Sequence, residues 1–204
     1  MTGVLVCFRS MNGSLADPLH ARRWFWWACA FEAFLAVLAL ALGSALHLRT
    51  AASFRWSTLD AVWGLVGTLP LLGLLALLLK TGSAWMHEIV RFLDGSLRPI
   101  FGQWSLLQLA ILSVLAGIGE ELLFRGLVQE GGGRLIGPWA GLIVASLLFG
   151  SFHWITRGYA LLAGSISIYL GLLWMWSGNL LVPIITHGAY DFLALVYFLR
   201  MRPG

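Results

Sequence analysis

Long apolar segments alternate with short polar segments along most of the chain. A helix of about 20 apolar residues is long enough to cross the hydrocarbon core of a bilayer. The pattern therefore predicts six membrane-spanning helices, at residues 24–46, 59–79, 103–130, 138–155, 159–176 and 180–199. Residues 80–99 mix apolar and charged positions and are predicted to form an amphipathic helix at the membrane interface. The predicted fold is all-α, a polytopic transmembrane helical bundle of about six spans plus this interfacial helix.

Turn-forming residues set the predicted ends of the helices. The three glycines at 131–133 are expected to end the third span, and Pro138 suits the first turn of the fourth. Residues 1–22 are predicted to be an N-terminal cytoplasmic leader, with Met11 as an alternative start. Residues 23–200 then form a single transmembrane helical domain, whose motif-bearing core is residues 104–199.

Composition supports a membrane protein. The 204 residues are 59% hydrophobic and only 11% charged, whereas a soluble domain carries about 25% charged residues. The net charge of +4 comes from arginines near the ends of the predicted spans, so nucleic acid is not an expected partner. Cys7 and Cys29 are not spaced as metal ligands, and Cys29 is expected to behave as a small hydrophobic residue.

The distribution of Lys and Arg predicts the orientation. Loops on the cytoplasmic side of a membrane carry an excess of these residues. With the N-terminus in the cytoplasm, nine lie inside and three outside: Arg9, Arg22, Arg23, Lys80, Arg91, Arg98, Arg157, Arg200 and Arg202 against Arg49, Arg55 and Arg134. We therefore expect an integral membrane protein of the cell inner (plasma) membrane with a cytoplasmic N-terminus and membrane lipids as neighbours.

Three ionisable residues interrupt the third apolar segment. Each costs roughly 2.5–3.5 kcal/mol at membrane depth, and such residues usually face a bundle interior and mark a functional site. Glu121 and Arg125 have the i,i+4 spacing of a helical ion pair, so a structural role explains both. Glu120 points about 100° away and gains no such partner. We therefore predict that Glu120 takes part in chemistry.

Two further segments carry polar side chains that could join Glu120. Phe149 and His153 share one face of the fourth span, and His187 and Asp191 share one face of the last. Counted from the predicted turns at 1.5 Å per residue, Glu120, His153 and His187 lie roughly 10–22 Å from the same side of the membrane. All three are therefore expected to meet in one layer.

The order and spacing of these residues resemble a known family. Glu120-Glu121-x-x-x-Arg125, Phe149-x-x-x-His153 and His187-x-x-x-Asp191 are similar to the three motifs of the CPBP intramembrane proteases. This family comprises CAAX prenyl endopeptidases and bacteriocin-processing enzymes. The resemblance covers about residues 106–199. It implies a peptidase that acts on peptide or protein substrates, some of them lipid-modified.

The resemblance also implies roles for the residues. Glu120, with His153, would be the general base that activates a water, and His187 and Asp191 would stabilise the oxyanion. An ionised Asp191 cannot donate a hydrogen bond to an oxyanion, so we expect it to orient His187 instead. Glu121 and Arg125 would support the helix and the electrostatics of the site.

Three alternatives use the same residues differently. Glu120, His153 and His187 are a ligand set that zinc could use with an open position, although no cofactor is our expectation. A non-catalytic membrane scaffold or bacteriocin-immunity protein would keep the fold but has no need for Glu120 or His187. A small transporter would also carry polar residues in its spans, but the chain shows no repeat of the kind many transporters have.

Overall fold

The computed structural model of the protein describes residues 18–48 and 50–202, and every regular element in these ranges is helical. The elements are α2 (Pro18–Ala45), α3 (Thr58–Thr81), α4 (Ala84–Phe92), η1 (Leu93–Leu97), α5 (Arg98–Phe101), α6 (Leu106–Glu121), η2 (Leu122–Gln129), α7 (Glu130–Ile136), α8 (Pro138–Phe152), α9 (Arg157–Ser177), α10 (Leu181–Val196) and η3 (Tyr197–Met201). Segments η1, η2 and η3 are wound as π-helix. The predicted all-α fold class is confirmed.

Within the described ranges, five helices are long and apolar enough to cross a membrane. They are α2, α3, α9, the continuous helix from α6 through α7, and the continuous helix from α10 through η3. The protein is therefore an integral membrane protein. The fourth predicted span is a shorter helix, because α8 has 15 residues and ends at Phe152 rather than at residue 155.

The predicted end of the third span at the three glycines is wrong. The helix continues through α7 to Ile136, and the chain turns at Gly137, which has a φ of 95°. Glycine inside a helix costs only about 1 kcal/mol relative to alanine, and close packing here offsets this cost. A Cβ on Gly132 would lie 3.3 Å from the Cα of Gly141 on α8, so the glycines let α7 and α8 approach each other.

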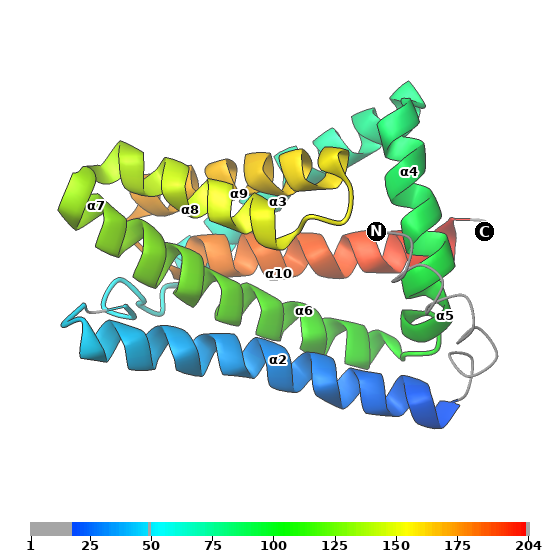
Figure 1. Ribbon diagram of the computed structural model, residues 1–204, viewed down its shortest axis with the longest axis horizontal. Coiled ribbons are helices and arrows are strands. Elements are labelled where there is room, and N and C mark those ends of the chain that lie inside the picture. The colour runs from blue at the N-terminus through cyan, green and yellow to red at the C-terminus, as the bar shows by residue number, and fades with distance from the viewer. Residues whose placement is uncertain (1–17, 49, 203–204) are drawn as a thin grey trace.

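The predicted amphipathic segment forms three short elements, α4, η1 and α5, that stand across one end of the bundle. Figure 1 shows the start of α2 and the end of η3 at this same end. Arg98 joins these parts, since its side chain donates to Asp94 at 3.1 Å and to the carbonyl oxygen of Arg202 at 3.2 Å. The segment thus caps the space between the long helices.

Helices α6 and α10 lie at the centre of the bundle. Helix α10 packs against both α6 and α3, while α6 also packs against α2 (Figure 1). Ser105 begins α6 with a capping box, in which Gln108 and Ser105 exchange side-chain to backbone hydrogen bonds. Cys29 of α2 is a buried free cysteine in the apolar cluster around Trp104.

The predicted leader lies mostly outside the described residues, as do Cys7 and Met11. Helix α2 begins at Pro18, so residues 18–22 are its first turns.

Candidate active site

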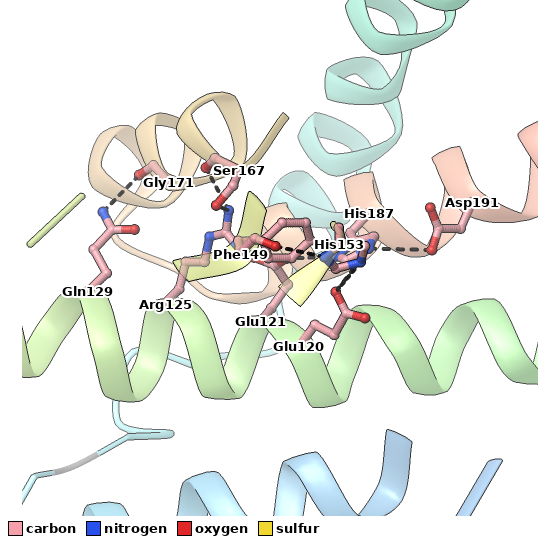
Figure 2. Close-up of polar contacts among 10 residues, drawn as sticks. All are labelled: Glu120, Glu121, Arg125, Gln129, Phe149, His153, Ser167, Gly171, His187 and Asp191. Atoms are coloured by element: carbon pink, nitrogen blue, oxygen red, sulfur yellow. Dashed lines mark hydrogen bonds and ion pairs between the residues drawn. The ribbon is translucent and has the colours of Figure 1, made fainter. Parts of the chain in front are cut away.

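Three side chains that the sequence predicts to converge do meet in the structure. Glu120 lies at the end of α6, His153 directly follows α8, and His187 lies on α10. The Glu120 Oε2 atom is 4.0 Å from Nε2 of His153 and 3.9 Å from Nε2 of His187. Figure 2 shows both imidazole rings next to the Glu120 carboxylate. Residues 67 positions apart are thus brought to one point.

A glycine contact between α6 and α10 explains how Glu120 and His187 come so close. A Cβ on Gly117 would lie 2.7 Å from the carbonyl oxygen of Ile184 and 3.1 Å from the amide nitrogen of Gly188. A Cβ on Gly188 would lie 3.0 Å from the carbonyl oxygen of Ser113. Any side chain at these positions would push the helices apart. The two glycines therefore set the distance between the carboxylate and the imidazole.

Glu121 and Arg125 form the predicted ion pair, with 3.1 Å between Oε1 and Nη1 and no exposed side-chain surface on either residue. Arg125 also donates to the carbonyl oxygen and the hydroxyl of Ser167 on α9, at 2.6 and 2.9 Å (Figure 2). Its guanidinium lies over the Phe149 ring, 5.5 Å from the centroid. The pair thus ties α6 and η2 to α9 and to the end of α8.

Glu121 also contacts His187, which the sequence analysis did not predict. The Nδ1 atom of His187 lies 2.8 Å from Oε1 of Glu121. Asp191, the expected orienting partner, contacts the other ring nitrogen, with 3.4 Å between Oδ2 and Nε2. A carboxylate only accepts hydrogen bonds, so Nδ1 of His187 carries a proton and donates it to Glu121. Of the two carboxylate contacts to the His187 ring, the one with Glu121 is the shorter.

His153 is oriented by its own helix. Its Nδ1 lies 2.9 Å from the carbonyl oxygen of Phe149, and its ring stacks on the Phe149 ring with 4.3 Å between centroids. A carbonyl oxygen can only accept, so Nδ1 carries the proton in the neutral ring and Nε2 presents a lone pair. The lone pair lies on the nitrogen nearest Glu120.

An apolar cavity of about 840 Å³ reaches the site from the end of the bundle that α4 and α5 cover. It lies among α2, α4, α5, α6 and α10, and most of its lining is aromatic or aliphatic. Glu120 and Asp191 lie on its wall. Pockets that bind small molecules measure about 300–1,000 Å³. The cavity is at the upper end of this range, so it is large enough for a short peptide segment or a lipid chain.

Glu32 of α2 also lines this cavity and was missed by the sequence analysis. It is an acidic residue in the middle of the first apolar helix, where the next charged residue towards the N-terminus is Arg23. A charge inside a span is by itself a sign of a functional site, and this signal could have identified Glu32.

The ligand set considered for zinc does not have the geometry of a zinc site. Among the described residues, no group of three or more His, Cys, Asp or Glu side chains is arranged to hold a metal ion. Ligand atoms around tetrahedral zinc lie about 3.3 Å apart, given bonds of about 2.0–2.1 Å. The Nε2 atoms of His153 and His187 lie 4.0 and 3.9 Å from Oε2 of Glu120, which is too far.

Comparison with known proteins finds matches over the part of the chain that carries the three motifs. Residues 102–193 match the family described as type II CAAX prenyl endopeptidase Rce1-like. The chain is also 36% identical over 102 residues to the uncharacterized protein YpbD of Bacillus subtilis (strain 168), a match that covers 48% of this chain and 50% of that relative. The chain thus spans about half the length of this curated relative. No solved structure matches the chain. The matched region contains all three motifs, so residues 102–193 of the chain are similar to the family of CAAX-type endopeptidases.

Proposed function

We propose that the protein is an intramembrane endopeptidase that hydrolyses peptide bonds of membrane-associated or lipid-modified peptides. One observation carries the proposal. The buried Oε2 atom of Glu120 has no hydrogen-bond partner in the protein, yet it lies about 4 Å from two imidazole nitrogens and on the wall of an apolar cavity. A buried acceptor of this kind is costly unless it serves a ligand or a reaction.

Glu120 and His153 activate the water. Their atoms lie 4.0 Å apart, which is too far for a direct hydrogen bond but allows one water to bond to both at about 2.8 Å. Such a water donates one proton to Oε2 of Glu120 and the other to the lone pair on Nε2 of His153. Its oxygen then faces the carbonyl carbon of a peptide in the cavity. Glu120 takes the proton as the oxygen adds to that carbon.

His187 stabilises the oxyanion that forms. In this step the His187 ring carries a proton on both nitrogens, with Nδ1 donating to Glu121 and Nε2 lying 3.4 Å from Oδ2 of Asp191. The Nε2 proton then points towards the developing negative charge. Glu120 passes its proton to the leaving nitrogen as the carbon–nitrogen bond breaks, which releases an acid and an amine. Between turnovers, Asp191 keeps the His187 ring oriented through its contact with Nε2.

Glu121 and Arg125 hold His187 and the surrounding helices in position. Their full burial and their contacts to Ser167, Phe149 and His187 make them a support for the site rather than reactants. The matched family is described as a type II CAAX prenyl endopeptidase, and an apolar cavity beside the site suits an apolar substrate.

The enzyme works without a metal ion, in the inner (plasma) membrane, with its N-terminus in the cytoplasm. Three arginines of α5, η3 and the residue after η3 support this orientation, because Arg98, Arg200 and Arg202 gather at the end of the bundle where α2 starts (Figure 1).

The test compares peptides released from membranes by the wild type with those released by Glu120→Gln and Glu120→Ala. Specific fragments should be absent from both variants and present with Glu130→Gln, whose side chain pairs with Arg134 at the protein surface. Full proteolysis by a folded Glu120→Gln variant would rule the mechanism out. If Glu120→Ala combined with His187→Ala kept the biological effect, the scaffold function would be correct instead.

A further inference from the structure

Two unpartnered polar atoms, besides Oε2 of Glu120, lie on the wall of the large cavity. They are Oε2 of Glu32 and the hydroxyl oxygen of Ser113, both buried and without a hydrogen-bond partner. Ser113 is only 1% exposed. Buried polar groups are almost always hydrogen-bonded in native proteins, so three such atoms on one mostly apolar wall point to a ligand that bonds to them.

The positions of these residues are fixed by helix geometry. Ser113 and Glu120 are seven residues apart on α6, so they lie on one face of the helix and about 10 Å apart along its axis. Helix α2 touches α6 beside Glu120, since a Cβ on Gly119 would lie 2.4 Å from the carbonyl oxygen of Glu32. Glu32 is thereby held at the level of Glu120, and its neighbour Phe31 lines the same cavity.

An extended peptide is the ligand that fits this pattern. A peptide that enters an apolar cavity carries amide groups that lose their hydrogen bonds to water, and each unsatisfied group is costly. An extended chain advances about 3.3 Å per residue, so about three residues span the distance from Ser113 to Glu120. A lipid chain would need no such partners along its length.

We propose that Glu32 and Ser113 form a polar track that binds the backbone amides of an extended, apolar peptide next to Glu120. Glu32 accepts from a backbone N–H, and the Ser113 hydroxyl bonds to another amide about three residues away from the bond that is cleaved. Glu32 lies outside the region that matches the family, so this contact is a property of the first helix of this chain. The inference rests on the proposed function, because it deepens the substrate class of the same site.

The test measures peptide binding to the purified full chain that carries Glu120→Gln, so hydrolysis does not consume the probe. The probe is a dansyl-labelled pentapeptide of leucine and valine, and its partner is the same peptide with N-methylated amides, which lacks the N–H donors. Energy transfer from tryptophan gives the two dissociation constants. N-methylation should weaken binding about tenfold, and Glu32→Ala or Ser113→Ala should reduce this ratio below about threefold. A residue that only supports the fold would not change the ratio.

Matched controls are Glu130→Ala and Ser165→Ala, which remove a partly exposed and an exposed polar side chain outside the cavity and should keep the tenfold ratio. A ratio that stays near ten in both cavity variants, or a parent protein that binds both peptides equally, overturns the inference. If Glu32→Ala does not fold, Ser113→Ala and Glu32→Leu decide the outcome, because a leucine side chain cannot accept from a backbone N–H. In one further outcome, the Glu120→Gln variant prefers the unmethylated peptide while the wild type cleaves no peptide. That result would support the polar track and reject the proposed hydrolysis.

Discussion

Glu121 and His187, which are 66 positions apart in the chain, share a 2.8 Å contact between Oε1 and Nδ1, and the same carboxylate oxygen accepts from Arg125 at 3.1 Å. One carboxylate therefore connects the ion pair of α6 and η2 with the imidazole of α10. Because all three side chains are almost fully buried, the loss of any of them leaves a charge or a polar group without its partner.

Glu121→Ala should unfold the protein at a lower temperature than any surface variant. Removal of one partner from a buried ion pair costs about 3–5 kcal/mol, because the other charge stays buried. Thermal unfolding in detergent measures the loss. Glu121→Leu combined with Arg125→Met removes both charges and should regain much of the stability, though not the activity. Equal losses in the single and double variants would contradict the ion-pair interpretation.

Glu121→Gln should lower the rate of peptide hydrolysis by about 10–100-fold, by analogy with residues that orient a catalytic or metal-bound histidine. A neutral glutamine accepts the hydrogen bond from Nδ1 of His187 more weakly than a carboxylate does. The imidazole ring is then held less firmly, so its Nε2–H no longer points reliably at the oxyanion. The measurement is kcat on one peptide, with Asp191→Asn alongside. The smaller effect should come from Asp191→Asn, since its contact with His187 is longer at 3.4 Å.

Gly117→Ala should separate Glu120 from His187 and reduce activity more than tenfold. The added Cβ would lie 2.7 Å from the carbonyl oxygen of Ile184, so α6 and α10 must move apart. A displacement of about 1 Å at an active site can cost 100-fold in rate. Gly73→Ala is the control, because a Cβ there meets nothing within 4 Å and adds up to about 1 kcal/mol of helix stability. Full activity of Gly117→Ala would show that this packing does not set the site.

Asn179→Ala should destabilise the protein by about 1–3 kcal/mol and leave the reaction chemistry intact. The fully buried Asn179 amide accepts from the backbone of Arg55 and Leu181 and donates to Asp60 at 2.7 Å, which joins the starts of α3 and α10. The unfolding temperature and the kcat of the folded fraction are measured together. Ser165→Ala, at an exposed site, should change neither value.

Treatment with a chelator should leave the proposed hydrolysis unchanged. In the proposed mechanism Glu120 and His153 activate the water without a metal ion, and their nitrogen–oxygen separation of 4.0 Å leaves room for one water. The check is proteolysis after dialysis against EDTA, together with metal analysis of the purified protein. A loss of activity that added zinc restores would overturn the metal-free mechanism.

The pattern of apolar segments determined the all-helical fold and the approximate helix positions, since the length needed to cross a bilayer is a one-dimensional property. Local spacing also identified the Glu121–Arg125 pair, because residues four apart meet on any helix. The glycines at 131–133 misled the prediction, as their role depends on how α7 packs against α8 and not on local preference.

Only the tertiary structure decided which distant side chains touch. The contact of Glu121 with His187, the presence of Glu32 on the cavity wall and the spacing of Glu120 from both imidazoles all depend on how closely the helices pack. That approach is set by glycine contacts between helices at Gly117, Gly119 and Gly188. A single sequence shows that these glycines are present, but it does not show which helix each one faces.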